Sequence, residues 1–231
     1  IVYLKLKELG VSSVKIESHV KRWLVYSILT GRYSGSPESF FDYDIKQISE
    51  NPFEEYLKEK EEGELSEAFW NASLPQSLDT SVASSPYFNV FLASQVKAND
   101  RGFLSKDVLV SDLISLRGDI HHLFPKDYLK RNGLDRGDYN QIANYVYMQS
   151  EINIKVGNKP PRDYFEIVKS QMQDKYQQVS GLASDHELTD NLKMNCVPTV
   201  IQEMSIDDYN DFLILRRKLM ADKIKEYYHS L

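Results

Sequence analysis

Apolar residues recur at helical spacing near the start of the chain. Val20, Trp23, Leu24 and Ile28 lie one turn or less from their neighbours, and Gly31 follows as a typical helix stop. The pattern predicts an amphipathic helix that ends near residue 30.

Two Ser-Pro pairs predict further helix starts. Serine suits the N-cap and proline suits the first helical position, as in Ser36-Pro37 and Ser85-Pro86. The second of these helices should run to about Ala98. The strongly charged segment 54–67 has few apolar residues, so we expect an exposed helix or loop there.

The last third of the chain is helical in pattern again. Ser184 and Glu187 have the spacing of a capping box, and Ser205 with Asp208 is a weaker version of it. A helix of about 23 residues is expected after the second box. Its apolar stripe consists of Tyr209, Phe212, Leu213, Leu219, Met220, Ile224 and Tyr227. The basic run 216–218 is expected to be a solvated face of this helix.

The middle of the chain has a different pattern. Segments 113–124 and 142–148 are rich in β-branched and aromatic residues, which favours two short strands. A short helix should start at Glu151, capped by Ser150 and ended by Gly157. The expected fold is therefore mainly α, with a helical frame that encloses a small β-β-α unit.

We expect three parts within one compact domain. Residues 1–100 form an N-terminal helical part, 101–175 form the β-β-α core, and 176–231 form a C-terminal helical part. The sequence begins at Ile1 rather than Met, so we expect a fragment of a longer protein that lacks an N-terminal domain.

Composition narrows the class of protein. The 231 residues are 42% hydrophobic and 12% aromatic, which supports a buried core and argues against disorder. The single cysteine excludes an intrachain disulfide and a thiolate metal cluster. The chain has no signal peptide and no apolar run of about 18 residues, so we expect a cytoplasmic protein without a membrane partner. A net charge of −6 weighs against nucleic-acid binding over the whole surface but allows a local basic groove.

The residues with chemical potential fall within the middle segment. His121 and His122 come near the end of the first strand-like run, Asn144 is on the second, and Asn153 is nine positions later in the short helix. A neutral imidazole, with a pKa of about 6.5, can take a proton from water near pH 7. Adjacent strand residues point to opposite faces, so both histidines can reach one site only from a strand end or a bulge.

These segments resemble a known family. DIHHLFPKDYL, followed by IANYVYMQSEINIKVGNKPP, is similar to the HNH (His-Me finger, ββα-metal) endonucleases. More narrowly, it resembles the C-terminal nuclease module of GmrSD-like type IV modification-dependent restriction proteins. The flanking stretches KRWLVYSILTGRYSGSPES and YNDFLILRRKLMADKIKEYYHSL resemble the helical surround of that module.

The resemblance implies a role for each residue. His122 matches the general base, His121 and Asn153 match the metal ligands, and Asn144 matches the residue that holds the loop or orients the base. The implied cofactor is one divalent metal ion: Mg²⁺, Mn²⁺, Ni²⁺ or Zn²⁺. The first position is often acidic in relatives, and the imidazole found here suits transition metals better than Mg²⁺.

Each residue also has a structural interpretation. Asn144 is as well explained as a loop clamp, Asn153 as a residue that satisfies a helix end, and Asp119 as a turn residue after Gly118 rather than a further ligand. Three other histidines have no evident partners and are expected to be non-catalytic: His19, His186 and His229. Basic residues near the motif are expected to bind substrate phosphates, above all Lys155 and Lys159, and also Lys126 and Arg162.

The leading expectation is a metal-dependent DNA endonuclease module of a restriction or anti-phage defence protein. The alternative is a non-catalytic DNA-binding or regulatory module that retains the fold. A third reading is an assembly module whose long C-terminal helix pairs with a partner, and a homodimer is possible. The family resemblance implies an N-terminal regulatory domain that uses nucleotide hydrolysis. The chain itself lacks the Gly-Lys-Ser/Thr ending of a phosphate-binding loop, so we expect no NTPase activity from it alone.

Overall fold

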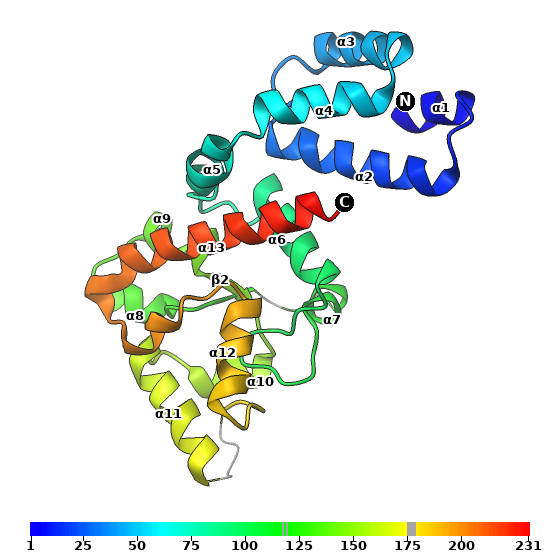
Figure 1. The fold of residues 1–231 in the computed structure, drawn as a ribbon. Helices are drawn as coiled ribbons and strands as arrows, with labels where there is room; N and C mark the ends of the chain where they lie inside the picture. Colours follow the sequence, from blue (N-terminus) through cyan, green and yellow to red (C-terminus); the bar gives the residue numbers. More distant parts are fainter. Residues whose placement is uncertain (117, 119, 175–178) are drawn as a thin grey trace. The chain divides into compact units, whose positions relative to one another are not determined.

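The computed structural model describes residues 1–231 except 117, 119 and 175–178 (Figure 1). The chain is mainly helical, as expected, and forms two compact units. The N-terminal unit comprises Ile1–Leu74 with Ile224–Leu231, and the central unit comprises Pro75–Lys223. The three-part division expected from the sequence stays a prediction.

The N-terminal unit consists of helices. Its elements are α1 (Val2–Glu8), α2 (Ser13–Leu29), α3 (Pro37–Glu50), α4 (Phe53–Glu64), a π-helical turn (Phe69–Ser73) and the last residues of α13 (Tyr209–His229). The predicted stop at Gly31 is confirmed, because α2 ends at Leu29 and Gly31 has a φ of +63°. The charged segment after residue 53 is a helix, and it buries Tyr56 and Leu57.

A buried ion pair lies in the core of this unit. The Arg32 guanidinium donates from Nε to Asp44 Oδ2 over 2.8 Å, and both side chains are almost fully buried. Tyr33 and Tyr56 each donate a hydroxyl hydrogen bond of 2.6 Å to the same carboxylate. Burial alone raises the pKa of Asp44, but the bonds from Arg32, Tyr33 and Tyr56 outweigh it and lower the pKa.

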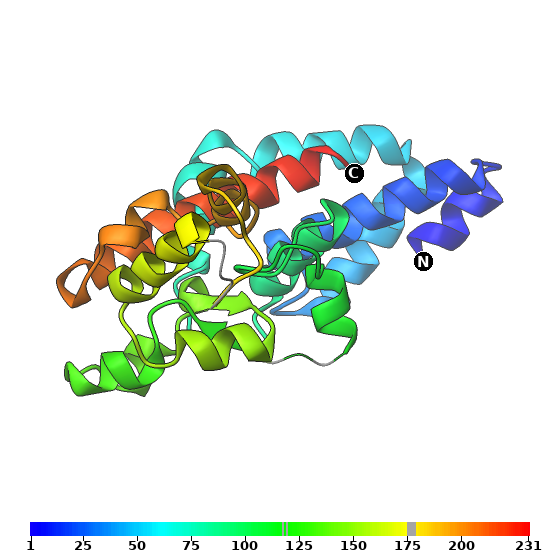
Figure 2. The ribbon, with the colours of Figure 1, turned by 90° about the horizontal axis from the view of Figure 1, so that it is seen from below.

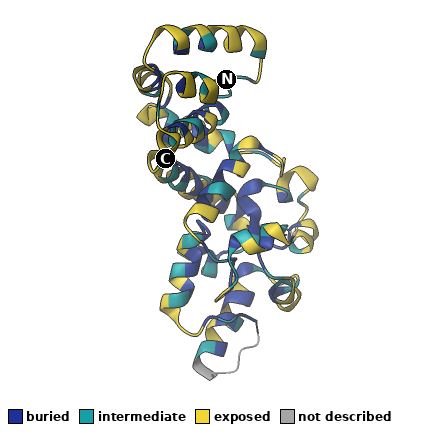
Figure 3. Ribbon diagram, turned by 90° about the vertical axis from the view of Figure 1, so that its right-hand side faces the viewer, coloured by how far each residue is buried: buried dark blue, intermediate teal, exposed yellow. Residues whose placement is uncertain are grey.

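The central unit contains the middle segment of the chain. Its helices are α6 (Pro86–Lys97), α7 (Val110–Ser115), α8 (Lys126–Arg131), α9 (Arg136–Tyr139), α10 (Ser150–Val156), α11 (Pro161–Asp174), α12 (Asp185–Met194) and most of α13; α5 (Leu74–Ser77) begins at the boundary. Short 3₁₀ helices cover Ile142–Asn144, Thr199–Glu203 and Ile206–Asp208. Figure 3 shows buried and exposed residues alternating along the helices, as amphipathic helices require. No helix in the described part of the chain is both long and apolar enough to cross a membrane.

One small antiparallel sheet lies in the central unit, next to α10 (Figure 2). It pairs β1 (Ile120–His122) with β2 (Tyr145–Tyr147), with Ile120 opposite Tyr147. Both strands are shorter than the expected runs. Residues 113–115 belong to α7, and 142–144 form a 3₁₀ turn rather than a strand. The chain turns closely at Gly118, where an added Cβ would lie 2.8 Å from the Leu113 carbonyl oxygen.

The long helix α13 joins the central core through aromatic contacts. The ring of Phe124, just after β1, lies 5.1 Å from Tyr209 and 5.0 Å from Phe212. The predicted stripe is partly wrong: Leu219 is exposed, and Tyr228 rather than Tyr227 is fully buried. The start of α13 therefore packs on the loop that follows the two histidines.

Candidate active site

The two histidines end β1, and both line one pocket. The Cα partners of His121 and His122 in β2 are Val146 and Tyr145. The pocket has a volume of about 300 Å³ and is lined by His121, His122, Pro125, Lys126, Asp127, Asn153, Ile154, Gly157 and Asn158. The strand ends at His122, so the alternation of strand faces does not separate the pair.

Asn140 holds the imidazole of His122. The Asn140 Oδ1 atom lies 3.1 Å from His122 Nε2. An amide oxygen accepts hydrogen bonds, so Nε2 carries the proton in this arrangement and Nδ1 carries the lone pair. The ring also packs edge-on against Tyr145, with 5.2 Å between centroids.

The surroundings of His122 favour the neutral ring. Burial is the largest influence and lowers its pKa below the ordinary value of 6.5, because a buried imidazolium loses hydration. The hydrogen bond to Asn140 acts in the opposite direction but is weaker, while Lys126 and His121 lower the pKa further. The ring is therefore uncharged near pH 7, which is the form that accepts a proton.

Asn144 holds the loop after β1 rather than lining the pocket. It lies in the 3₁₀ turn before β2, not on the strand as expected, and its side chain is fully buried. Its Oδ1 accepts from Phe124 N at 2.8 Å, and its Nδ2 donates to the carbonyls of Phe124 and Tyr139, both at 3.1 Å. These hydrogen bonds agree with the structural interpretation of Asn144 as a loop clamp.

Asn153 comes to the pocket from α10. This helix begins at Ser150 with Gln149 as the N-cap, one residue earlier than expected and without a side-chain cap. It ends at Val156 and is followed by Gly157, whose φ of +59° suits glycine. His121, His122 and Asn153 thus line one pocket, the histidines from β1 and the asparagine from α10.

The basic residues differ in their relation to the pocket. Lys126 lines it, with Nζ 5.5 Å from the centre of the Tyr139 ring. Lys155 is exposed outside the lining, and Lys159 donates to the carbonyls of Lys155 and Val156 over 3.4 and 3.5 Å. Arg162 donates to the Glu203 carbonyl, with the shorter bond at 2.7 Å. Lys126 is therefore the expected phosphate contact that lies at the pocket itself.

The expected solvated face at residues 216–218 is confirmed at Lys218, which is exposed, and is wrong at Arg216. Arg216 is 1% exposed rather than solvated, and its Nη1 donates to the Ala143 carbonyl over 2.8 Å, next to Asn144. Arg217 forms an ion pair with Asp79. The remaining histidines do have partners: His19 meets Glu54 at 3.1 Å, His186 meets Asp190 at 3.2 Å, and His229 packs on Trp70.

Metal ligands at the pocket are few. Within the described residues, no three His, Cys, Asp or Glu side chains come together as a metal-binding group. Asp119, weighed above as a further ligand, lies outside the described residues. Asp127 and Asn158 line the pocket and were not expected from the sequence. Oxygen ligands of their type are common in sites for hard cations.

Comparisons with known proteins add one relative. The chain is 27% identical over 221 residues to an uncharacterized protein of Methanocaldococcus jannaschii. The match covers 90% of this chain and 37% of that protein, so the chain spans little more than a third of its relative's length. No protein-family model and no solved structure matches the chain.

Proposed function

We propose that the central unit carries the HNH-type site of a metal-dependent DNA endonuclease, a hydrolase of phosphodiester bonds. The observation that carries the proposal is the shared pocket of His121, His122 and Asn153, built from β1 and α10 beside the β1–β2 pair. The order of strand, strand and helix, with a loop-clamping asparagine between, supports the same reading.

His122 is the general base of this proposal. With its Nε2 bound to Asn140, the ring offers Nδ1 to a water molecule and takes its proton as the water attacks phosphorus. The lowered pKa keeps this nitrogen unprotonated near neutral pH. Asn140 keeps the ring in one tautomer, and Asn144 keeps the loop in place through Phe124.

The donor set at the pocket fits a divalent cation. His121 provides an imidazole and Asn153 an amide oxygen, and both line the cavity. One ion among Mg²⁺, Mn²⁺, Ni²⁺ and Zn²⁺ would, when bound, offset the charge of the phosphate and of the leaving oxygen. Two protein ligands leave several coordination positions to water and substrate, which is usual for Mg²⁺.

DNA is the proposed substrate, and Lys126 at the pocket rim is its first expected phosphate contact. Lys155 is exposed on the same helix as Asn153 and is a further proposed phosphate contact. The same proposal includes a role in restriction or anti-phage defence and control by an N-terminal domain. It also includes pairing of two copies for double-strand cleavage.

A second candidate is a non-catalytic DNA-binding or regulatory module. It is favoured by the absence of a cluster of three His, Cys, Asp or Glu side chains over the part of the chain that is described. The two candidates differ in metal uptake. The endonuclease requires a divalent ion whose affinity depends on His121, whereas the regulatory module does not.

Supercoiled plasmid is the test substrate. We expect the purified chain to nick it in the presence of Mg²⁺, Mn²⁺, Ni²⁺ or Zn²⁺, and EDTA to stop the reaction. Calorimetry with Mn²⁺ should show uptake that His121→Ala reduces by about 10- to 100-fold. DNA binding without nicking, together with no uptake dependent on His121, would instead support the regulatory module.

A further inference from the structure

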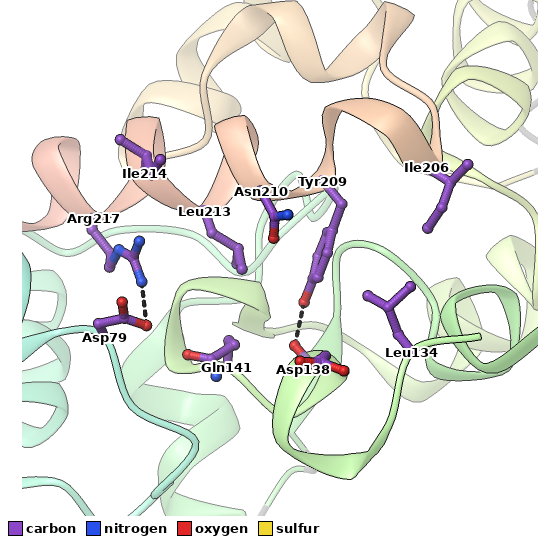
Figure 4. A pocket seen from close by; sticks show the side chains of 10 residues that line it. All are labelled: Asp79, Leu134, Asp138, Gln141, Ile206, Tyr209, Asn210, Leu213, Ile214 and Arg217. Atoms are coloured by element: carbon purple, nitrogen blue, oxygen red, sulfur yellow. Dashed lines mark hydrogen bonds and ion pairs between the residues drawn. The ribbon is translucent and has the colours of Figure 1, made fainter. Parts of the chain in front are cut away.

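A second and larger pocket lies in the central unit. It has a volume of about 520 Å³, and Figure 4 shows α13 on one side and the segment around Asp138 and Gln141 on the other. Four aliphatic side chains line part of it: Leu134, Ile206, Leu213 and Ile214. The pocket therefore combines an apolar wall with several polar groups.

Three hydrogen-bond donors of this pocket, from Arg217, Tyr209 and Gln141, are already engaged by the protein. Arg217 forms an ion pair with Asp79, as the dashed line in Figure 4 marks. The Tyr209 hydroxyl donates to the Asp138 carbonyl over 2.9 Å. Gln141 Nε2 donates to the Gly137 carbonyl over 2.7 Å. An anionic ligand that used any of these three donors would have to displace one of these bonds.

Acceptor capacity, in contrast, remains. One oxygen of the Asp138 carboxylate accepts from Asp135 N at 2.9 Å, which leaves its other oxygen for additional bonds. Gln141 Oε1 is buried and has no hydrogen-bond partner among the described residues. The side chain of Asp79 is 54% exposed beside Arg217. Two carboxylates against one guanidinium also make the lining acidic.

We propose that this pocket binds an alkylguanidinium group, such as the side chain of an arginine. A guanidinium has five N–H donors and no acceptor, which matches a lining of unused acceptors and excess negative charge. Its methylene stem matches the aliphatic wall around Leu213. The proposal does not depend on nuclease activity, since it concerns a separate cavity.

The bound group acts on the segment that holds His122. Asp138 and Gln141 line the pocket, while Asn140 between them bonds to His122 Nε2 at 3.1 Å. Tyr209 fixes the same segment through the Asp138 carbonyl. A ligand that bonds to Asp138 and Gln141 therefore changes the position of Asn140. This in turn changes the environment of the His122 ring.

The test is an NMR titration of the full chain at constant pH with three probes. N-acetyl-L-arginine amide and agmatine carry the guanidinium, and N-acetyl-L-citrulline amide has the same shape without the charge. We expect the two guanidinium probes to give saturable shifts of the Gln141 and Asn210 side-chain amides and of the His122 ring. Tighter binding of the arginine amide indicates a polypeptide source, and tighter binding of agmatine indicates a free small molecule.

Asp138→Asn tests the contact, because the asparagine oxygen can still accept from Asp135 N. We expect it to weaken arginine-amide binding about tenfold, as loss of a charge-assisted bond does. Asp107→Asn, the same change at an exposed site outside the pocket, should leave binding unchanged. Equal shifts with citrulline, no saturable shift in the wild type, or an unaffected Asp138→Asn variant would overturn the binding site. Saturable binding that leaves the His122 ring unshifted would overturn the link between the pockets.

Discussion

At the scale of single residues, the bond between Asn140 and His122 decides which imidazole nitrogen is available. The Oδ1 atom of Asn140 lies 3.1 Å from Nε2, which directs the lone pair to Nδ1. Removing this acceptor leaves the tautomer and the ring orientation less defined. Loss of a residue that orients a reacting group through a hydrogen bond typically lowers activity by one or two orders of magnitude.

Asn140→Leu, which keeps the size but removes the acceptor, should lower the rate of plasmid nicking by about 10- to 100-fold. Asn89→Leu, at an exposed site on α6, is the matched control and should cut at the wild-type rate. Single-turnover nicking gels measure both. An Asn140→Leu variant as fast as the control would show that this hydrogen bond does not position the base.

The sequence identified four residues that line the pocket, but not Asn140, which bonds to His122 without being part of the lining. The four are His121, His122, Lys126 and Asn153. His121, His122 and Asn153 could be identified because each falls at a position of the motif that this segment resembles. Asn140 follows the short helix α9, where asparagine is common at a helix end, so nothing in its local sequence indicates a role. The fold brings Asn140 next to His122 at the end of β1. Local sequence patterns do not encode such a contact.

Arg216 did leave a signal in the sequence. It lies three residues after Leu213 and four before Met220, so helical spacing places it on the buried stripe of α13. Its charge suggested a solvated face instead, within a run of three basic residues. The buried position became evident only with its partners, the carbonyls of Ala143 and Asn195, which are distant in sequence.

At the scale of elements, Asn144 ties the turn before β2 to the loop after β1. Its side chain makes three hydrogen bonds to backbone groups of Phe124 and Tyr139. Phe124 and Tyr139 are both buried, so these backbone groups have little access to water. A buried backbone group without a partner is costly to the folded state.

Asn144→Ala should therefore lower the free energy of unfolding by about 2–4 kcal/mol. Urea denaturation followed by circular dichroism measures this, and hydrogen exchange at the Phe124 amide should accelerate. Asn132→Ala serves as the control, because the Asn132 side chain bonds to the Tyr128 carbonyl at an exposed site. A loss no larger than that of the control would mean that Asn144 is not the clamp of this loop.

Element type was predictable where periodicity was strong, and less so in the short middle segment. The helix starts at Pro37 and Pro86 were predicted by their Ser-Pro signals. The strand limits were not, because Leu113 and Ile114 belong to α7 and the chain then turns at Gly118. Three-residue strands depend on pairing with a distant partner rather than on their own pattern.

At the scale of the whole molecule, the buried Arg32–Asp44 pair makes the N-terminal unit sensitive to acid. The pKa of Asp44 is lowered in the folded state, so the pair adds stability above the unfolded pKa of about 3.9. That contribution is lost as the pH falls below this value toward the folded pKa.

Asp44→Asn should lower the free energy of unfolding by about 3–5 kcal/mol at pH 7, because Arg32 is left buried without its carboxylate. The difference from the wild type should shrink as the pH falls below about 4. Both tryptophans, Trp23 and Trp70, belong to the N-terminal unit, so urea titrations followed by their fluorescence report on it. A difference that stays constant from pH 7 to about pH 3 would contradict the assignment.

The proposed DNA binding depends on local positive groups, because the net charge of the chain is −6. Lys126→Gln should weaken binding and reduce the slope of log affinity against log salt by about 0.9, the value for one phosphate contact. Lys97→Gln changes the same charge at an exposed site on α6, outside the pocket. Fluorescence anisotropy at several salt concentrations measures both slopes. Equal losses for the two variants would mean that Lys126 acts only through overall charge.

The most direct test of the central claim is plasmid nicking by His122→Ala. His186→Ala is the matched control, since His186 is exposed and bonded to Asp190. With the divalent ion that supports the fastest wild-type reaction, we predict that His122→Ala abolishes nicking while its circular dichroism spectrum stays that of the wild type, and that His186→Ala cuts normally. A folded His122→Ala protein that nicks plasmid at the wild-type rate would contradict the account.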